Sequence, residues 1–271
     1  MFWVNGLPQT HVPLGDRSFQ YGDGCFTTIK TKHGQLELWQ AHIERMEACL
    51  KTLHIPFPDW SQVFDWVMKA VLSDELAGIK IHISRGTGGR GYSPRGIEGP
   101  VVTISNFAFP SHYSLWQENG VQLGVCETRL GIQPILAGHK HNNRLEQVLA
   151  KAEIDDSEFA DAVTLNVQNH VIETTMANLF WVNDKKVYTP ELNLSGVAGV
   201  MRRQVLELLQ AEGYPVQVAE FTLADLLDAE EVWMCNSLLG VAPVCGISTP
   251  DNKIEFPIGK LTRRLQGNLN S

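Results

Sequence analysis

The hydrophobic pattern of this chain changes period along its length, and this change limits the possible folds more than any other feature. In the first third, a β-prone stretch at Phe26–Thr31 precedes apolar residues at helical spacing over Trp39–Leu53 and again at positions 63–71. Alternation with period 2 over Lys80–Ser84, followed by Val101–Ser105, then predicts two strands. This order of elements predicts a small α+β domain over residues 1–106.

The rest of the chain is richer in strand patterns. Residues 107–120 are the predicted linker, because Pro110 and small polar residues near the start of this stretch break both periodicities. A strong helix pattern over Val200–Glu212 is closed by Gly213. Further strands and one helix are expected at 121–127, 144–154 (helix), 161–167, 171–174, 179–182, 187–189, 231–235 and 241–247. We therefore predict a two-domain α+β fold whose larger, strand-rich C-terminal domain covers 121–271.

Charge and composition exclude several classes of function. The chain has 22 Lys and Arg against 30 Asp and Glu, and this balance argues against a nucleic-acid partner. No apolar run approaches the roughly 20 residues of a membrane span, and Met1–Gly6 does not begin a secretory signal, so we expect a cytoplasmic protein without a membrane partner. Five cysteines without a C-x-x-C pair indicate neither a disulfide framework nor a structural zinc site.

A glycine-rich segment at 86–91 has the spacing G-x-G-x-x-G and follows a predicted strand. Dinucleotide binding also requires a helix that begins at the glycines, and residues 92–96 do not supply one. What remains is a loop that carries Arg85, Arg90 and Arg95. Such a loop either grips carboxylates or is a solvated basic segment.

Three other positions leave a functional and a structural interpretation open. Lys140 stands between two histidines that have no third metal ligand at a suitable spacing, so no metal site is predicted, and spacing alone fits both a Schiff-base lysine and a surface lysine. Gly196 and Gly199 precede a strong helix, which suits either a phosphate site or an ordinary helix start. Glu173 lies in a β-prone stretch and is either buried with a partner or exposed.

In their order along the chain, these pieces resemble the class IV (fold type IV) family of pyridoxal-phosphate enzymes, which contains the branched-chain and D-amino acid aminotransferases. The resemblance covers nearly the whole chain and is carried by residues 21–26, 42–45, Lys140, Glu173, 178–180 and 199–202. It implies a two-domain fold with a C-terminal domain that binds pyridoxal 5'-phosphate, and a homodimer.

Within this family, residues 22–28, 84–93 and 136–147 are most similar to the aminodeoxychorismate lyase branch. The aminotransferases have Phe-Glu-Gly-Ile-Arg where this chain has Phe26-Thr27-Thr28-Ile29-Lys30. Met201 stands where the family usually has Thr, so the phosphate contact there would use the backbone N–H.

The resemblance also assigns roles to individual residues. Lys140 would hold the cofactor covalently, which requires the pKa of its amine to fall below the usual value of about 10.4. Glu173 would keep the pyridine nitrogen protonated, and Thr28 would relay a proton or orient the substrate. The phosphate is assigned to Arg45, Val200, Met201, Ser237 and Asn236, and the substrate carboxylates to Arg90, Arg85 and Tyr92.

The implied reaction converts 4-amino-4-deoxychorismate, a small anionic substrate, to 4-aminobenzoate and pyruvate. The substrate amine would displace Lys140 from the cofactor, Lys140 would remove the C4 proton, and loss of the enolpyruvyl group would make the ring aromatic. Three alternatives stay open: a class IV aminotransferase acting on D- or branched-chain amino acids, a nucleotide-binding module that uses the loop at 86–91, and a regulatory protein without catalysis.

Overall fold

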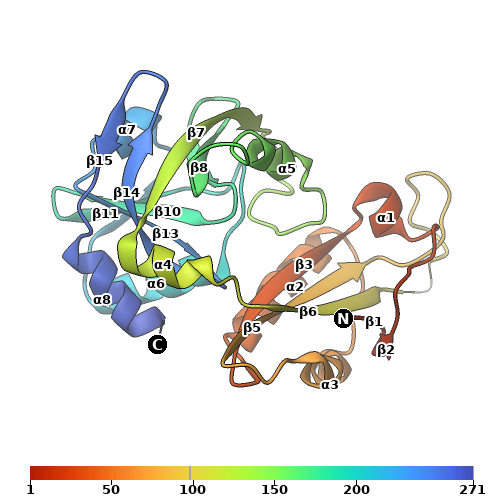
Figure 1. Cartoon of the computed structure of the whole chain (residues 1–271). Coiled ribbons are helices and arrows are strands. Elements are labelled where there is room, and N and C mark those ends of the chain that lie inside the picture. Colours follow the sequence, from red (N-terminus) through yellow and green to blue (C-terminus); the bar gives the residue numbers. More distant parts are fainter. Residues whose placement is uncertain (98, 271) are drawn as a thin grey trace. The chain divides into compact units, whose positions relative to one another are not determined.

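The computed structural model describes residues 1–97 and 99–270, which form two compact units (Figure 1). Unit 1 contains residues 1–109 and the short segment 139–143, and unit 2 contains 110–138 and the chain from 144 onward. Each unit combines helices with a sheet, so the predicted α+β class is confirmed. In the described part of the chain, every helix is too short or too polar to cross a membrane.

Unit 1 is built on a six-stranded sheet in which all neighbouring strands are antiparallel, in the order β2-β1-β6-β5-β3-β4. Its strands are β1 (Phe2–Val4), β2 (Leu7–Pro8), β3 (Gly24–Lys32), β4 (Gln35–Leu36), β5 (Leu76–Ser84) and β6 (Val101–Ala108). Its helices are α1 (Arg17–Tyr21), α2 (Trp39–Thr52) and α3 (Trp60–Ala70). The expected elements at 39–53, 63–71, 80–84 and 101–105 therefore overlap α2, α3, β5 and β6.

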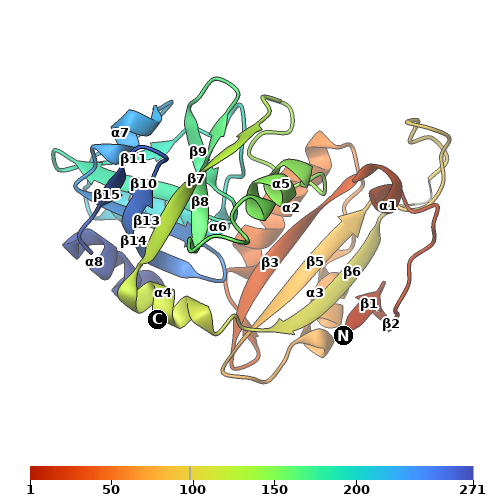
Figure 2. The ribbon, with the colours of Figure 1, turned by 45° about the horizontal axis from the view of Figure 1, so that its top comes forward.

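Helices α2 and α3 lie on the same side of this sheet (Figure 2). Side chains alternate across a strand, so every second residue of β5 points toward the helices: Ile79, Ile81 and Ile83 are fully buried there. Met46 and Leu50 of α2 belong to the same core cluster. The opposite face of β3 and β5 is consequently left to polar and aromatic side chains.

Unit 2 contains a nine-stranded mixed sheet in the order β12-β11-β10-β13-β14-β7-β8-β9, with β15 added beside β14. Its strands are β7 (Val121–Leu130), β8 (Asp161–Asn166), β9 (Val171–Thr174), β10 (Asn178–Asn183), β11 (Lys186–Pro190), β12 (Val216–Ala219), β13 (Glu231–Asn236), β14 (Gly240–Ser248) and β15 (Lys253–Glu255). Its helices are α4 (His112–Asn119), α5 (Leu145–Ala152), α6 (Val200–Ala211), α7 (Leu223–Leu227) and α8 (Lys260–Leu269). The core includes stacked Phe180 and Trp233, whose ring centroids are 5.5 Å apart.

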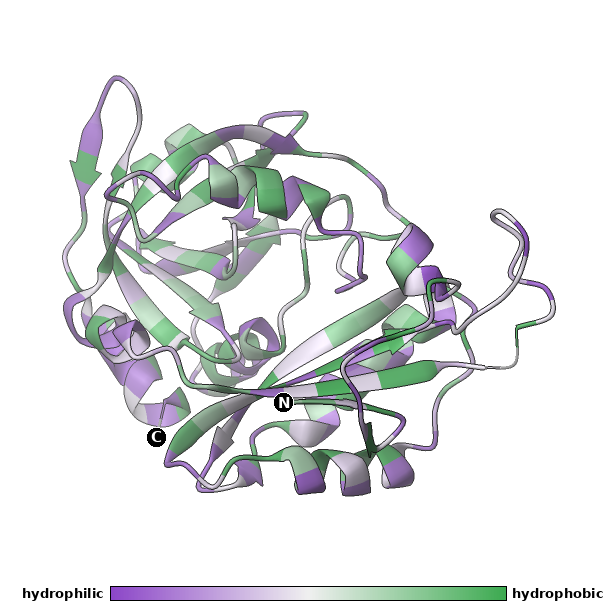
Figure 3. Cartoon of the chain, turned by 45° about the vertical axis from the view of Figure 1, so that its right-hand side comes forward, coloured by the Kyte–Doolittle hydropathy of each residue, from purple (hydrophilic) through white to green (hydrophobic). Residues whose placement is uncertain are grey.

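Helix α6 shows why the hydrophobic pattern of the sequence predicts helices correctly. Val200, Met201, Val205 and Leu209 are buried and recur at helical spacing, while the residues between them are more exposed. Hydrophobic and hydrophilic residues also alternate along several other helices (Figure 3). The helix predicted over 200–212 is therefore α6, which is one residue shorter.

The predicted linker at 107–120 contains the last residues of β6 and all of α4, and the chain passes from unit 1 to unit 2 between Phe109 and Pro110. The segment 139–143 belongs to unit 1 although its neighbours on both sides belong to unit 2. The hydrophobic period of a sequence reflects local structure. It does not indicate that a short segment between two parts of one unit packs with the other unit. The domain boundaries inferred from the sequence stay a prediction.

Candidate active site

Lys140 belongs to the segment 139–143, which is hydrogen-bonded to strand β3 within unit 1. The Phe26 amide donates to the Lys140 carbonyl at 3.0 Å, and the Asn142 amide donates to the Gly24 carbonyl at 2.9 Å. The Lys140 Nζ lies 4.7 Å from the centroid of the Phe26 ring. Strand β3 therefore fixes the main chain around Lys140, and the ring of Phe26 supports its side chain.

The face of the unit 1 sheet opposite α2 and α3 carries a second lysine. Thr28 pairs with Lys80, and Phe26 pairs with His82, across β3 and β5. The Lys80 Nζ lies 4.5 Å from the centroid of the Phe26 ring, so this ring contacts Lys80 as well as Lys140. Burial lowers the pKa of Lys80, and burial together with the charge of Lys80 lowers the pKa of His82.

Lys80 was not among the site residues predicted from the sequence. A lysine in an alternating strand is ordinarily a solvated residue, and its significance depends on which residue lies across from it. The position of Lys80 in the site follows from the register between β3 and β5, which places Lys80 directly beside Thr28. The sequence alone does not give this register.

Arg45 projects from α2 and is bound to β3 through Thr27. The Arg45 Nη2 donates to the Thr27 hydroxyl at 2.6 Å, and the same hydroxyl lies 2.6 Å from the His42 Nδ1. Thr27 and His42 are both buried.

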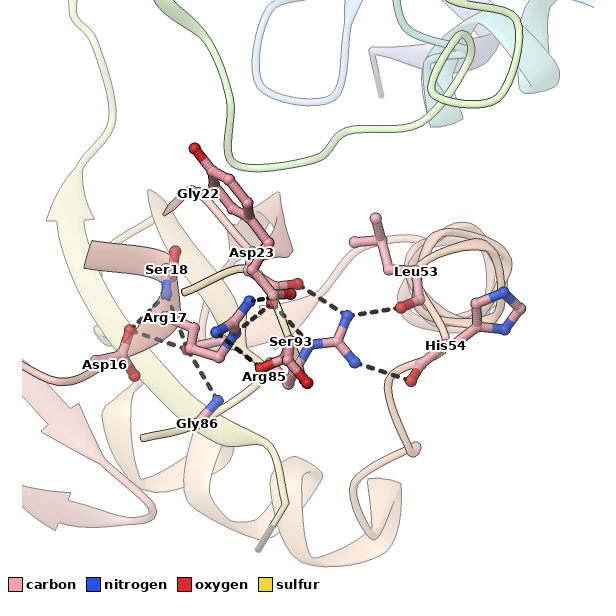
Figure 4. A network of polar contacts seen from close by, with 12 residues as sticks. Asp16, Arg17, Ser18, Gly22, Asp23, Leu53, His54, Arg85, Gly86 and Ser93 are labelled. Atoms are coloured by element: carbon pink, nitrogen blue, oxygen red, sulfur yellow. Dashed lines mark hydrogen bonds and ion pairs between the residues drawn. The ribbon is translucent and has the colours of Figure 1, made fainter. Parts of the chain in front are cut away.

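Arg85 is engaged inside unit 1, where its guanidinium pairs with Asp23 (Figure 4). The Nε and Nη2 atoms donate to the two Asp23 carboxylate oxygens at 2.7 and 3.0 Å, and the Nη atoms also donate to the carbonyls of Leu53 and His54. A substrate carboxylate would have to compete with these partners. The role of Arg85 in substrate binding stays a prediction, and the structure gives this residue a role in holding unit 1 together.

Asp23 also binds Arg17, which anchors the glycine-rich loop. The Arg17 Nε donates to Asp23 at 2.8 Å, and its Nη atoms donate to the carbonyls of residues 91–93 (Figure 4). Burial raises the pKa of the Asp23 carboxyl, but the hydrogen bonds and charges of Arg85 and Arg17 outweigh it and lower the pKa overall.

Residues 87–96 of the glycine-rich loop are exposed, and no helix begins within the described residues 85–97. The geometry required for dinucleotide binding is therefore missing from that stretch. Tyr92 is 88% exposed, and its ring meets Tyr21 edge-on with the centroids 5.6 Å apart. Arg90 is exposed at the same tip, where its carbonyl accepts a hydrogen bond from the Ser93 amide. The two residues are close together and open to solvent.

In unit 2, Glu173 is a buried carboxylate on β9. Its Oε2 accepts from the Val197 amide at 3.1 Å and from the Asn178 side chain at 3.3 Å. The Asn178 side-chain oxygen in turn accepts from the Gly199 amide at 3.2 Å. Of the two interpretations left open for Glu173, burial with partners is confirmed.

Asn178 thus joins Glu173 to Gly199, the residue that precedes α6. Gly199 caps this helix without a side-chain hydrogen bond, and a Cβ at that position would lie 2.2 Å from the Asn178 Oδ1. Glycine is therefore required by the close approach of Asn178. Val200 and Met201 have buried side chains, so they offer their main-chain N–H groups at the helix start, where an anion is favoured.

The other two residues predicted to bind phosphate are Asn236, the last residue of β13, and Ser237, in the turn between β13 and β14. The Asn236 side-chain oxygen accepts from the Leu238 and Leu239 amides at 3.0 and 2.8 Å, and its amide donates to the Met176 carbonyl. Asn236 therefore shapes the turn that carries Ser237. Ser237 is partly exposed on that turn.

The predicted residues form two groups. Unit 1 contains Lys140, Thr28, Arg45, Arg85, Arg90 and Tyr92, and unit 2 contains Glu173, Val200, Met201, Asn236 and Ser237. Within unit 1, strand β3 brings Lys140, Thr28 and Arg45 together. Within unit 2, Asn178 brings Glu173 to the start of α6.

Residues 24–247, a range that includes every predicted site residue, match the family Amino-transferase class IV. The chain belongs to the class IV aminotransferase family. The predicted resemblance to this family is confirmed.

Individual relatives match most or all of this chain. The aminodeoxychorismate lyase of Vibrio harveyi is 84% identical over 271 residues, which is all of both chains. The aminodeoxychorismate lyase of Bacillus subtilis is 30% identical and covers 90% of this chain and 85% of its own. The crystal structure of 4-amino-4-deoxychorismate lyase from Pseudomonas aeruginosa superposes with a TM-score of 0.92, at 36% identity, over 99% of this chain and 97% of that chain.

Unit 2 of this class IV chain also contains a cavity of about 530 Å³ that involves none of the predicted residues. Its lining consists of three aromatic rings, two carboxylates and two smaller residues: Trp181, Tyr188, Phe221, Asp225, Asp228, Asn183 and Ala224. The carboxylates would repel a phosphate or a carboxylate substrate. The cavity is therefore unsuited to the anionic ligands expected here.

Proposed function

We propose that this protein is a pyridoxal-phosphate-dependent lyase that converts 4-amino-4-deoxychorismate to 4-aminobenzoate and pyruvate. The observation that carries the proposal is the 84% identity, over the whole chain, to the Vibrio harveyi aminodeoxychorismate lyase. Membership of the class IV family supports the cofactor. The motif Phe26-Thr27-Thr28, in place of the pattern typical of aminotransferases, supports the lyase reaction.

The chemistry of the residues fits pyridoxal phosphate. The Lys140 amine would bind the aldehyde, and the buried Glu173 carboxylate would pair with a protonated ring nitrogen. The phosphate would bind the guanidinium of Arg45 and the start of α6. Asn178 bonds both Glu173 and Gly199, so the carboxylate and the helix start keep a fixed spacing.

Lys140 follows closely, along the chain, a residue that is hydrogen-bonded within unit 2. Gly138 exchanges main-chain hydrogen bonds with Gly196 and Ala198 in unit 2, at 3.0 and 2.9 Å. Lys140 is bonded to Phe26 in unit 1. A single residue, His139, separates Gly138 from Lys140.

When bound, the cofactor supplies an electron sink for the carbon that carries the substrate nitrogen. Lys140, the residue that would hold the cofactor, would also take the proton from C4 of the substrate. The C3–O bond then breaks with its electron pair leaving on the enolpyruvyl oxygen, and proton uptake gives pyruvate. The Thr28 hydroxyl, beside Lys80 on the neighbouring strand, would orient the ring or pass on this proton.

The substrate carboxylates require cationic or hydrogen-bonding partners. Arg90 and Tyr92 at the exposed loop tip remain candidates for one carboxylate. Lys80 is added as a candidate for the other, because it lies beside Thr28 and contacts the same Phe26 ring as Lys140. Arg85 would serve indirectly by holding Asp23.

The test begins with the absorbance spectrum of the purified protein, followed by borohydride reduction and peptide mapping. We expect a visible band, a reduced adduct on Lys140, and formation of 4-aminobenzoate and pyruvate in equal amounts. Lys140→Ala should lose both the band and turnover, whereas Lys69→Ala, a change at an exposed lysine of α3, should keep both. Retention of the band and of turnover by Lys140→Ala would refute the assignment.

The aminotransferase alternative makes a different prediction. With a D- or branched-chain amino acid alone, an aminotransferase converts its cofactor stoichiometrically to the pyridoxamine form. We expect this half-reaction to be much slower than release of 4-aminobenzoate. If it is the faster of the two, the protein is an aminotransferase.

We also propose a homodimer, with the exposed face of α5 as part of the contact. Leu145, Val148 and Leu149 recur at helical spacing and are at least 60% exposed. Contiguous apolar side chains at this spacing are typical of protein–protein contacts. Light scattering should give twice the monomer mass of 30.2 kDa, and Leu149→Lys should lower it. A monomeric native protein would contradict this part of the proposal.

A further inference from the structure

Thr27 places a hydroxyl in a row of apolar side chains. On β3, the buried residues Cys25, Thr27 and Ile29 point toward α2, and Thr27 pairs with the fully buried Ile81 of β5. A valine would fill nearly the same volume there and would need no hydrogen-bond partner. The presence of a hydroxyl at this position must therefore be explained by the bonds that it makes.

The two short hydrogen bonds of Thr27 have a defined direction. A guanidinium only donates, so the bond from Arg45 occupies a lone pair of the Thr27 oxygen. The single hydroxyl proton is then available for the His42 Nδ1, 2.6 Å away, which accepts it as the Nε2–H tautomer. The result is a chain of donors from Arg45 through Thr27 to His42.

The chain ties one helix to one strand. His42 and Arg45 are three residues apart on α2 and therefore lie on the same helix face. Thr27 lies between them on β3, and the next residue toward the N-terminus, Phe26, bonds the Lys140 carbonyl. Adjacent residues of β3 thus hold Arg45 through a side chain and Lys140 through the main chain.

We propose that Thr27 and His42 are positioning residues that aim the Arg45 guanidinium at the cofactor phosphate without touching the cofactor themselves. This inference rests on the proposed function, because it assumes that Arg45 binds that phosphate. The hydroxyl of Thr27 fixes the guanidinium at a set distance from Lys140, so the phosphate and the aldehyde of one molecule reach their partners together.

The test compares two probes that differ only in the phosphate. The full chain, freed of cofactor, is titrated with pyridoxal 5'-phosphate and with pyridoxal, and both dissociation constants are measured by absorbance. We expect Thr27→Val to weaken binding of the phosphorylated probe about tenfold, the usual effect of losing one charge-assisted hydrogen bond, and to leave pyridoxal binding unchanged. Thr27→Ser, which restores the hydroxyl, should bind both probes like the native protein.

His42 provides a second pair of variants. His42→Asn retains an acceptor near the Nδ1 position and should resemble the native protein, whereas His42→Leu should show the selective loss seen with Thr27→Val. Equal weakening of both probes by Thr27→Val, or no weakening of either, overturns the inference and leaves the proposed function intact. A native protein that binds neither probe overturns the proposed function and this inference with it.

Discussion

The amide of Phe26 donates a hydrogen bond to the carbonyl of Lys140 at 3.0 Å, and the ring of the same residue lies 4.7 Å from the Lys140 Nζ. One residue of β3 thus supports both the main chain and the side chain of the lysine assigned to the cofactor. The two contacts have different consequences, because a substitution removes the ring and leaves the amide.

Phe26→Leu should reduce turnover modestly and keep the cofactor. Loss of a cation–π contact costs about 0.5–1 kcal/mol at a partly exposed site, which corresponds to a roughly two- to fivefold effect. The measurement is kcat from the fluorescence of 4-aminobenzoate, with bound cofactor quantified by absorbance. Phe26→Tyr, which keeps the aromatic face, should be near native. A loss of cofactor in Phe26→Leu would show that the ring has a different role.

Glu173→Gln should retain the cofactor and lose most of the rate. The amide still has an oxygen to accept from the Val197 amide, but it has no charge to stabilise a protonated pyridine. We expect a loss of kcat of about a hundredfold or more, on the scale of a lost electrostatic catalytic group. The 4-aminobenzoate assay and the absorbance band are measured on the same samples. Turnover within a few-fold of native would exclude the assigned role.

Lys80→Met should raise KM more than it lowers kcat, because Lys80 is proposed to bind a substrate carboxylate and to take no part in proton transfer. The methionine keeps the length and apolar stem of the side chain and removes the charge. Initial rates over a range of substrate concentrations separate the two constants. Lys80→Arg should recover part of the lost affinity, and an unchanged KM in Lys80→Met would exclude the carboxylate contact.

Asp23→Asn should destabilise unit 1 at neutral pH. Removing the charge that pairs with Arg17 and Arg85 costs about 3 kcal/mol for a largely buried pair. The native pKa of Asp23 is lowered, so its stabilising effect is complete above the unfolded value of about 4 and is lost as the pH falls through the folded value.

Thermal melting between pH 2 and 7 measures this effect. The native protein and Asp23→Asn should differ most at pH 7, and the difference should shrink below about pH 4 as the carboxylate takes up a proton. Asp65→Asn, a change at an exposed residue of α3, serves as the control and should melt like the native protein. A difference that grows as the pH falls would contradict the assigned ion pairs.

Local hydrophobic patterns in the sequence predicted a large part of the secondary structure, but they did not predict every helix. The apolar spacing of α2 and α6 and the alternation of β5 are properties of neighbouring residues, and they were predicted close to their observed positions. Helix α4 falls where a linker was expected, and α8 was not predicted. Proline and small polar residues before α4 end one pattern without showing that another begins.

The sequence by itself determined the α+β class, most of the helices and strands, and the ordered motifs that carry the family resemblance. Only the tertiary structure decided that Asp23 engages Arg85, that Lys80 lies beside Thr28, and that the five residues around Lys140 join unit 1. The reason is physical. A hydrophobic period indicates which side of a helix or strand is buried. Strand register, ion pairing and the packing of the segment 139–143 with unit 1 depend instead on residues far apart in the chain.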